Sequence, residues 1–329
     1  MADGSSIFYF LDVKPKIAIL LATCNGSSHL EELVDSVLAQ KGPDFTVFAS
    51  DDGSDDLTPE ILAEYASRFP GRFRILDGES RMPKRLGACG HFLRMLENVS
   101  ADIYLLADQD DIWEEDHLRE LLASYKKLSP KERDAPALVF SDMSVIDGDG
   151  KLLAKSFLSS EKLPRKVPRR HFYFVQNNIS GCASLFNRAL RDFALSHTDG
   201  LKKNLSSIPM HDAFLAATAA VFGKILFVDK PLLKYRVHAK NVLGMQPVTS
   251  FAHIVLRLRN QRNDFRKAQR FAAFFADYFG EILPAGEFRT LSRFASLGKR
   301  SKISRVFLLF RNGFLKAGFF RKLSQIVLW

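Results

Sequence analysis

The pattern of apolar and polar positions predicts that strands and helices alternate in the first part of the chain. Short apolar runs with many β-branched residues are typical of buried strands, and four of them occur, at 16–22, 46–50, 73–76 and 103–107. After the first run, apolar residues fall at the spacing of one helix face at Leu30, Leu33, Val34, Val37 and Leu38. Strands that alternate with helices predict βαβ units and a largely parallel sheet.

Two short patterns predict where helices begin. Ser28-His29-Leu30-Glu31 fits a capping box, in which the Ser28 hydroxyl and the Glu31 carboxylate each accept from the other residue's backbone N–H. Thr58-Pro59 predicts another helix start, with Thr58 as the N-cap. Further helices are expected around 88–98, 115–127 and 213–221.

Charge and aromatic content change near residue 245. Residues 251–329 hold 16 Lys and Arg, 4 Asp and Glu, and 13 of the 29 Phe. The chain before them holds 31 basic and 33 acidic residues, so the formal charge of +10 belongs to the later part. We therefore expect two parts, 1–245 and 246–329, the second a basic helical region. Its apolar residues are helically spaced, which fits either a subdomain packed on the first part or a helix lying on an anionic membrane.

Composition excludes several classes of protein. With 47% hydrophobic and 26% charged residues, the chain is neither disordered nor a disulfide scaffold. Its three cysteines form no Cys-x-x-Cys pair, which excludes zinc ribbons and thioredoxin-type redox sites. No secretory signal or run of about 18 apolar residues occurs. We expect a cytoplasmic protein, peripheral at the inner face of the membrane.

Acidic residues follow two of the predicted strands. Asp51-Asp52-Gly53-Ser54 comes after the second, and Asp108-Gln109-Asp110-Asp111 after the fourth. Ligands of such sheets bind at the carboxyl ends of the strands. Crowded carboxylates repel one another unless a cation neutralises them, and oxygen ligands suit Mg²⁺ or Mn²⁺. The alternative for each cluster is a solvated turn that caps the next helix.

Glycine-rich phosphate-binding loops are absent from the sequence, which contains neither Gly-x-Gly-x-x-Gly nor a P-loop motif. A diphosphate would therefore need a metal together with basic side chains. Arg81, Lys84 and Arg85, after the third predicted strand, are the candidates, and a solvated basic loop is the equally good alternative.

Six segments occur in an order that resembles a known family. They are ATCNG (22–26), DDGSDDLT (51–58), LADQDDIW (106–113), NNISGCASLFN (177–187), MHDAF (210–214) and YRVHAKNVLG (235–244). Over roughly residues 14–245 the chain resembles the family 2 inverting glycosyltransferases of the GT-A fold, and within them the bacterial rhamnosyltransferase-like enzymes. The resemblance implies a Rossmann-like α/β fold with a mixed, mostly parallel sheet flanked by helices.

The resemblance also implies roles for individual residues around the nucleotide sugar. The residues that it places around the nucleotide are Ala22, Thr23, Asn25, Asp51 and Asp52. Gln109 and Arg85 would contact the donor, although Arg85-Leu86-Gly87 departs from the Asn-x-Gly that the family pattern leads us to expect.

Further roles concern the reacting groups. The resemblance makes Asp108 and Asp110 the metal pair, with Asp110 in direct contact, and Asp212 the catalytic base. The Gly181-Cys182 segment would form part of the wall around the acceptor and the donor sugar, and Arg236 with His238 would close over the diphosphate. Without the resemblance, Asp212 is better explained as a charge that complements a helix N-terminus.

The expected reaction moves a sugar from a nucleotide-diphosphate donor to a hydroxyl of a bacterial cell-surface glycan or a polyprenyl-linked acceptor. Such a transfer needs a carboxylate that takes the acceptor proton and a Lewis acid, here Mg²⁺ or Mn²⁺, on the leaving diphosphate. The resemblance suggests dTDP-L-rhamnose as the donor. Nucleic acid is not an expected partner, because the acidic clusters would repel its phosphates.

Two other functions fit the chain less well. A nucleotidyltransferase also combines a Rossmann-like sheet with an acidic metal site, but it would need a basic residue in the loop 23–28, which has none. A non-catalytic peripheral membrane protein would explain the basic tail but not the acidic clusters.

Overall fold

The computed structural model describes residues 14–76, 85–237 and 251–329, with side chains at 251–262 and 299 outside the description. The strands are β1 (Ile17–Thr23), β2 (Thr46–Asp51), β3 (Phe73–Ile75), β4 (Ile103–Asp108), β5 (Ile112–Trp113), β6 (Ala137–Ile146), β7 (Leu152–Ala154), β8 (Ser184–Asn187) and β9 (Lys224–Arg236). The helices before residue 238 are α1 (Leu30–Leu38), α2 (Thr58–Arg68), α3 (Gly87–Asn98), α4 (His117–Tyr125), α5 (Pro130–Asp134), α6 (Phe157–Ser160), α7 (Arg188–Ala194), α8 (Thr198–Lys203) and α9 (His211–Phe222). Those after residue 250 are α11 (Phe251–Tyr278), α12 (Ala285–Ala295), α13 (Lys302–Asn312) and α14 (Phe319–Leu328).

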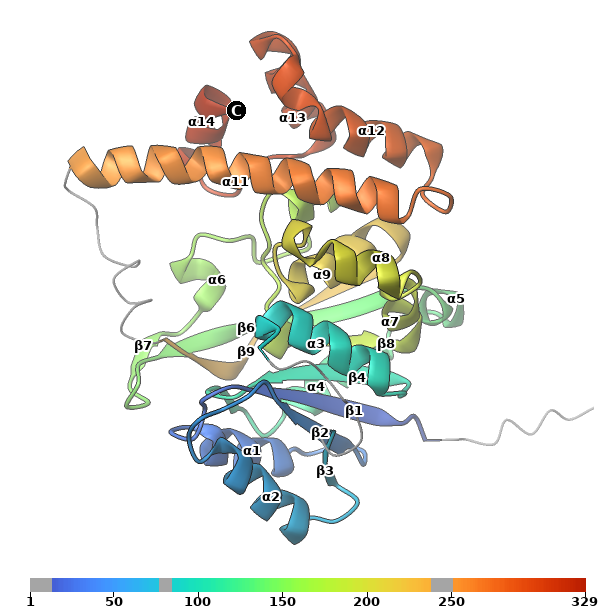
Figure 1. Ribbon diagram of the computed structural model, residues 1–329, viewed down its shortest axis with the longest axis vertical. Helices are drawn as coiled ribbons and strands as arrows, with labels where there is room; N and C mark the ends of the chain where they lie inside the picture. Colours follow the sequence, from blue (N-terminus) through green and yellow to red (C-terminus); the bar gives the residue numbers. More distant parts are fainter. Residues whose placement is uncertain (1–13, 77–84, 238–250) are drawn as a thin grey trace, which may run out of the picture.

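One mixed nine-stranded sheet organises the chain (Figure 1). Its order is β3-β2-β1-β4-β8-β6-β9-β5, and β7 pairs with β6. Strands β3, β2, β1 and β4 are parallel, whereas β8 runs antiparallel between β4 and β6. All four strands predicted from apolar runs are present, each within one residue of its expected ends. The predicted α/β fold, with helices on both faces of a mixed sheet, is confirmed.

Two apolar cores lie on opposite faces of the sheet, and β1 shows why both can form. Side chains alternate between the faces of a strand. Ile17, Ile19 and Leu21 belong to the core that includes the apolar faces of α1, α2 and α4, while Ala18 and Leu20 belong to the other core. A strand that is buried on both faces needs a continuous apolar run, which explains the sequence of β1.

The helices after residue 250 share the second of these cores. Helix α11 packs against α9 and against the short 3₁₀ helix η1 (Arg170–Phe174). The ring centroids of Phe275 and Phe174 lie 5.0 Å apart, and those of Phe279 and Phe222 also lie 5.0 Å apart. Among the two explanations of the basic region, packing onto the first part therefore accounts for its buried phenylalanines. A division into two domains near residue 245 stays a proposal, because residues 238–250 lie outside the described residues.

Both predicted helix starts are wrong in detail. The N-cap of α1 is His29, and no side chain caps the helix; instead the Gly26 carbonyl accepts from the N–H groups of His29 and Leu30, both at 3.1 Å. Thr58 is the first residue of α2, after the N-cap Leu57. Its hydroxyl accepts from the Gly26 N–H at 2.9 Å, so a contact between distant loops replaces the expected local cap.

Candidate functional site

The carboxyl ends of β1, β2 and β4 bring the acidic segments to one edge of the sheet. In the strand register Ala22 pairs with Asp108, and Thr23 pairs with Asp51. Parallel neighbours end together, so segments that are more than fifty residues apart in the sequence meet here (Figure 1). This is the edge that the sequence predicted.

Asp51 organises the loop after β2. One of its carboxylate oxygens accepts from the N–H groups of Gly53 and Ser54, at 3.0 and 2.8 Å, and the other accepts from the Thr23 hydroxyl at 3.0 Å. Asp51 thereby forms the Asx turn that was the alternative to a binding role. The same bonds hold the loop after β2 against the end of β1, beside Ala22.

Asp52 is 3% exposed and joins the loop after β2 to α3. Its two carboxylate oxygens accept from the backbone N–H groups of Leu86 and Gly87, at 3.0 and 2.9 Å. A carboxylate at a helix N-terminus complements unsatisfied N–H groups there. Direct contact between Asp52 and a base or ribose stays a prediction.

Gln109 ties the loop after β4 to the loop after β1. Its amide oxygen accepts from the Cys24 N–H at 2.7 Å, and its amide nitrogen donates to the Cys24 carbonyl at 3.0 Å. Gly26 leaves room for this side chain, because a Cβ atom there would lie 2.4 Å from the Gln109 amide oxygen. Asn25, with a φ of 52°, accepts from the Asp55 N–H at 2.8 Å and so positions the next loop.

A buried acidic cluster follows β4. One carboxylate oxygen each of Asp108 and Asp111 and the Sγ atom of Cys182 lie within 4.8 Å of one another. Burial and the negative charge of Asp110 raise the pKa of Asp108 to about 6. Burial and the charges of Asp108 and Asp110 raise the pKa of Asp111 well above its usual range. Carboxylates arranged in this way are costly without a counter-charge.

The cluster fits a divalent cation. Asp111 is fully buried, and its Oδ2 atom has no hydrogen-bond partner among the described residues. An orphaned buried carboxylate oxygen beside a second carboxylate suits a hard cation such as Mg²⁺ or Mn²⁺. Asp110 is half-buried and lies outside the closest set, so its direct contact with metal stays a prediction.

The Arg236 side chain is buried and contacts this acidic loop. Its guanidinium donates to the carbonyl oxygens of Asp110 at 2.8 Å and Gly148 at 2.8 Å, and it forms an ion pair with Glu32 at 2.5 Å. Its backbone N–H also donates to Asp111 at 3.1 Å. Only 3% of Arg236 is exposed. These contacts give it a positioning role, and the diphosphate contact that the sequence suggested stays a prediction.

Asp212 lies in the first turn of α9 at the same edge. Burial raises the pKa of its carboxyl group to about 7, and the charge of Asp108 adds to the rise. Hydrogen bonds from the backbone of Ala213 and Gly181 and from the Asn177 side chain oppose it. A carboxylate that titrates near neutral pH can take a proton efficiently.

Gly181 is required where α9 begins. A Cβ atom at this position would lie 2.7 Å from Nε2 of His211 and 3.3 Å from a methyl group of Leu106. His211 is itself buried, with its ring 4.3 Å from that of Phe92. Burial lowers the pKa of His211 to about 3, so the ring is neutral. Gly181 thus lets the neutral histidine approach closely and fixes its neighbour Asp212.

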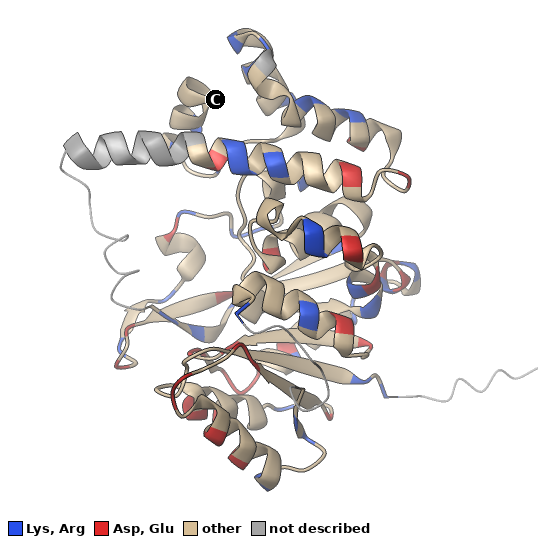
Figure 2. Ribbon diagram, viewed as in Figure 1, with Lys and Arg blue, Asp and Glu red and all other residues tan. Residues whose placement is uncertain are grey.

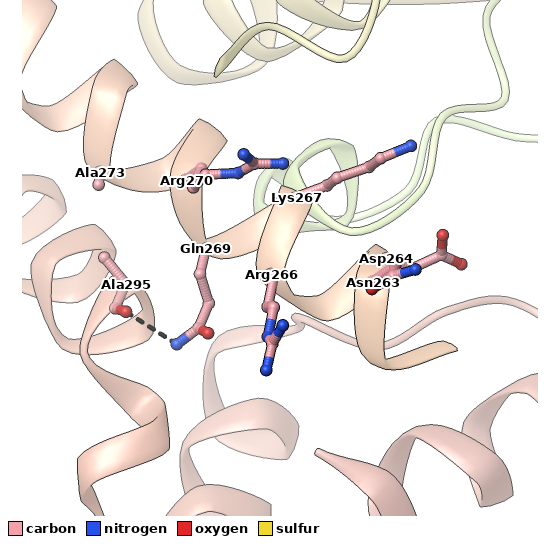
Figure 3. A pocket seen from close by; sticks show the side chains of 8 residues that line it. All are labelled: Asn263, Asp264, Arg266, Lys267, Gln269, Arg270, Ala273 and Ala295. Carbon is pink, nitrogen blue, oxygen red and sulfur yellow. Dashed lines mark hydrogen bonds between the residues drawn. The ribbon is translucent and has the colours of Figure 1, made fainter. Parts of the chain in front are cut away.

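A large hollow lies elsewhere, beside α11 (Figure 3). It measures about 1020 Å³ and is lined by Asn263, Asp264, Arg266, Lys267, Gln269, Arg270, Ala273 and Ala295. Its basic side chains do not converge, since Arg266 and Arg270 point in different directions. The carboxylates with raised pKa values lie at the acidic edge of the sheet and not in this open hollow.

Comparison with known proteins decides the family. The model of the family described as "Glycosyl transferase family 2" matches residues 18–192, more than half of the chain. The chain belongs to glycosyltransferase family 2.

Relatives of this glycosyltransferase agree with that assignment. The chain is 25% identical over 313 residues to the dTDP-rhamnosyl transferase RfbG of Shigella flexneri, which covers 88% of this chain and 97% of that protein. It is 21% identical over 230 residues to an uncharacterized glycosyltransferase of Nostoc sp., covering 69% and 66% of the two chains. Both the family and the relatives establish a glycosyltransferase and replace the nucleotidyltransferase and non-catalytic alternatives.

Among solved structures, the mannosyltransferase PcManGT from Pyrobaculum calidifontis, in complex with GDP-Man and Mn²⁺, resembles the chain with a TM-score of 0.50 at 16% identity. The match covers 90% of this chain and 73% of that one. At this identity the likeness concerns the fold, which is the GT-A fold expected from the sequence.

Two further predicted site residues of the glycosyltransferase are Arg85 and His238. Arg85 is exposed, with a φ of 66°, and its guanidinium lies 3.4 Å from Asp55. His238 lies outside the described residues, as do Arg81 and Lys84.

Two residues near the acidic cluster, Asp111 and Tyr235, had no individual role in the sequence analysis, and a third, Cys182, was expected only in the sugar-binding wall. The charges of Asp108 and Asp111, together with burial, raise the pKa of both the Cys182 thiol and the Tyr235 hydroxyl. Asp111 could have been found from the Asp108-Gln109-Asp110-Asp111 run. Tyr235 stood in the YRVH segment, but nothing in the sequence placed Cys182 beside the acids.

Proposed function

We propose that this family 2 enzyme transfers a sugar with inversion from a nucleoside diphosphate donor to an acceptor hydroxyl, with Asp212 as the general base. The observation that carries the proposal is the position of Asp212. It lies in the first turn of α9, against Gly181, where burial, with a smaller contribution from the charge of Asp108, raises the pKa of its carboxyl group to about 7. A base that lies near the edge proposed to bind the diphosphate suits displacement at an anomeric carbon.

The proposed reaction balances in one step. The Asp212 carboxylate takes the proton of the acceptor hydroxyl as that oxygen bonds to the anomeric carbon. The bond from the anomeric carbon to the diphosphate breaks at the opposite face, which inverts the configuration and releases the nucleoside diphosphate. Family membership supports glycosyl transfer, and the pKa of about 7 supports Asp212 as the base of a single displacement.

Asp108 and Asp111, with Asp110 beside them, would hold Mg²⁺ or Mn²⁺. Such a cation, when bound, neutralises charge on the leaving diphosphate. The raised pKa of Asp108 and the orphaned oxygen of Asp111 support a cation here. Gln109 and Arg236 keep the cluster in place through the contacts described above.

The donor would lie along the ends of β1 and β2, beside Ala22, Thr23, Asn25 and Asp51. RfbG is named as a dTDP-rhamnosyl transferase, which supports dTDP-L-rhamnose as the first donor to try. For the acceptor we propose a hydroxyl of a cell-surface glycan or of a polyprenyl-linked precursor. A lipid-linked acceptor would place the reaction at the inner face of the membrane.

A panel of nucleotide sugars, assayed for release of nucleoside diphosphate with and without Mn²⁺, tests the proposal. Asp212→Asn should lower turnover by about 10²–10⁴-fold while leaving donor affinity within a few-fold, because the carboxamide keeps the shape but cannot take a proton. Asp199→Asn is the matched control, since Asp199 also lies in the first turn of a helix, α8, but is exposed. Equal losses in both variants would favour helix complementation over base catalysis.

A further inference from the structure

Seven large apolar side chains are exposed on α13 and α14, and we call them the apolar patch. They are Ile303, Phe307, Phe310, Phe319, Phe320, Leu323 and Val327. Their exposed fractions run from 48% at Leu323 to 85% at Ile303. They make up seven of the fifteen exposed large apolar side chains among the described residues, although they fall within 25 positions. Concentration of this kind marks an interaction surface.

The patch is distinct from the packed faces of the same helices. On α13, Leu308 and Leu309 are buried while the patch residues at 303, 307 and 310 follow helical spacing on another face. On α14, Gln325 is buried and its amide donates to the Phe314 carbonyl at 2.7 Å. Each helix therefore has one face in the core and a second apolar face with nothing upon it among the described residues.

The two helices present the patch together at one end of the molecule. The Arg305 guanidinium of α13 donates to the carbonyl of Trp329, directly after α14, at 2.6 Å. Both helices lie on the side of α11 that faces away from the sheet (Figure 1).

The segment that carries the patch has charged residues of a single sign, although two of them pair with acids outside the segment, Lys316 with Asp264 and Arg321 with Glu161. Residues 288–329 contain ten Lys and Arg and no Asp or Glu. The rest of the chain holds 37 basic and 37 acidic residues, so this segment carries the whole net charge of +10. Lys302, Arg311 and Lys322 are exposed beside the patch, and Arg311 lies over the Phe307 ring at 5.8 Å. Figure 2 shows acidic residues instead on α1 and α2, at the opposite end.

We propose that the apolar patch of α13 and α14 docks on an anionic lipid surface, with its phenylalanines below the headgroups and its basic residues among them. Helices that lie in the plane of a membrane combine these two features. A second copy of the chain is a poorer occupant, because a symmetric contact would bring two segments of charge +10 together. No helix in the described part of the chain is long and apolar enough to cross a bilayer, so the proposed contact is with the surface.

Co-sedimentation of the full chain with phosphatidylglycerol–phosphatidylcholine vesicles, compared with pure phosphatidylcholine vesicles, tests the proposal. Binding is expected to the anionic vesicles at low salt and to weaken as salt rises. Phe319→Ser/Phe320→Ser should lower vesicle affinity at least ten-fold without loss of thermal stability, since both rings are more than 70% exposed. Lys302→Glu/Lys322→Glu should do the same at low salt.

Leu152→Ser/Leu153→Ser is the matched control, because these neighbours in β7 are 51% and 46% exposed but lie outside the patch. It should bind vesicles like the original chain. The proposal fails if the full chain ignores anionic vesicles, or if the control loses as much affinity as the phenylalanine variant. It also fails if the chain is a dimer by light scattering and the phenylalanine variant is a monomer, since the patch is then a contact between copies. Asp212→Asn should still bind vesicles, so this surface and the proposed catalysis are tested separately.

Discussion

The side-chain amide of Gln109 exchanges two hydrogen bonds with the backbone of Cys24, 85 positions earlier in the chain. This pair fixes the distance between the loop after β4, which carries the acids, and the loop after β1, where we place the nucleotide. The side-chain amide pairs with the Cys24 backbone through one donated and one accepted hydrogen bond, as a residue of a neighbouring strand would.

We expect Gln109→Ala to raise the KM for the donor about ten-fold. The variant loses two hydrogen bonds of about 1 kcal/mol each between the loops after β1 and β4, so donor binding must itself bring these loops together. Gly26→Ala should have a similar effect, since its Cβ would collide with the Gln109 amide. Gly286→Ala in α12 is the control, as a Cβ there meets nothing within 4 Å. Donor KM, measured by steady-state kinetics, is the readout, and an unchanged value in both variants would remove Gln109 from the donor site.

Gly181→Ala should lower turnover more than it lowers stability. The new Cβ atom would push His211 away from 2.7 Å, and the carboxylate of Asp212 would move with it. A displacement of this size at a general base is expected to cost at least ten-fold in kcat. Steady-state kinetics and thermal unfolding of the same preparation separate the two effects. Normal kcat would show that the start of α9 tolerates the shift.

Arg236→Met should destabilise the fold by about 2–4 kcal/mol, because the carbonyl oxygens of Asp110 and Gly148 lose their donor, at about 1–3 kcal/mol for each acceptor left unsatisfied. Glu32→Gln is the milder comparison: the Glu32 side chain is 53% exposed, and the guanidinium keeps its carbonyl partners. Urea unfolding measures both. If Arg236→Met instead unfolds like the original chain and loses only donor affinity, the diphosphate role suggested by the sequence is correct.

Stability should fall as pH drops below about 6.5, in part through His117. Burial lowers the pKa of this ring to about 3, and its Nδ1 lies 3.2 Å from the Leu232 carbonyl. The unfolded chain therefore binds the proton first, so the free energy of unfolding decreases between pH 6.5 and 3 by about 1.4 kcal/mol per pH unit for each such group. His117→Phe should flatten the dependence between pH 7 and 5 by about 2 kcal/mol in urea titrations. An unchanged slope would show that His117 is accessible to protons in the folded state.

A chain ended after Met245 should be insoluble or loosely packed, because removal of α11 uncovers the rings of Phe174, Phe214 and Phe222. Phe275→Ala in the full chain should cost about 3–5 kcal/mol of unfolding free energy, the usual loss for a buried phenylalanine. Phe319→Ala, at a 74% exposed ring, should cost almost nothing. A soluble, cooperatively folding 1–245 chain would instead establish two domains with a boundary near residue 245.

The positions of residues that directly follow parallel strands could be predicted from the sequence, whereas the position of Cys182 beside them could not. The apolar runs located β1, β2 and β4, and parallel strands bring their ends together, so the neighbourhood of Asp51 and Asp108 followed from sequence. Cys182 reaches the same place only because β8 inserts antiparallel beside β4, a pairing with no local signal.

Local patterns also misled where long-range contacts competed with them. Thr58 fits a helix cap, but its hydroxyl accepts from Gly26 instead. Arg236 stands in the YRVHAKNVLG segment, but no motif in the sequence specifies the contacts of its guanidinium with the Asp110 and Gly148 carbonyls. In the basic region, helical spacing of apolar residues is the same for a core and for a lipid surface; only the exposed fractions separate Phe275 from Phe319.

The core that α11 shares with η1 and α9 has a consequence for how the chain comes to be folded. Phe275 covers Phe174, which the ribosome makes roughly a hundred residues earlier. During synthesis the apolar surface of η1 and α9 stays uncovered until α11 has emerged, and contacts of such sequence separation form slowly. Domains usually fold as they leave the ribosome, but the second core of this enzyme can close only after α11 has emerged. Until α11 has emerged, the nascent chain therefore exposes an apolar surface to which chaperones can bind.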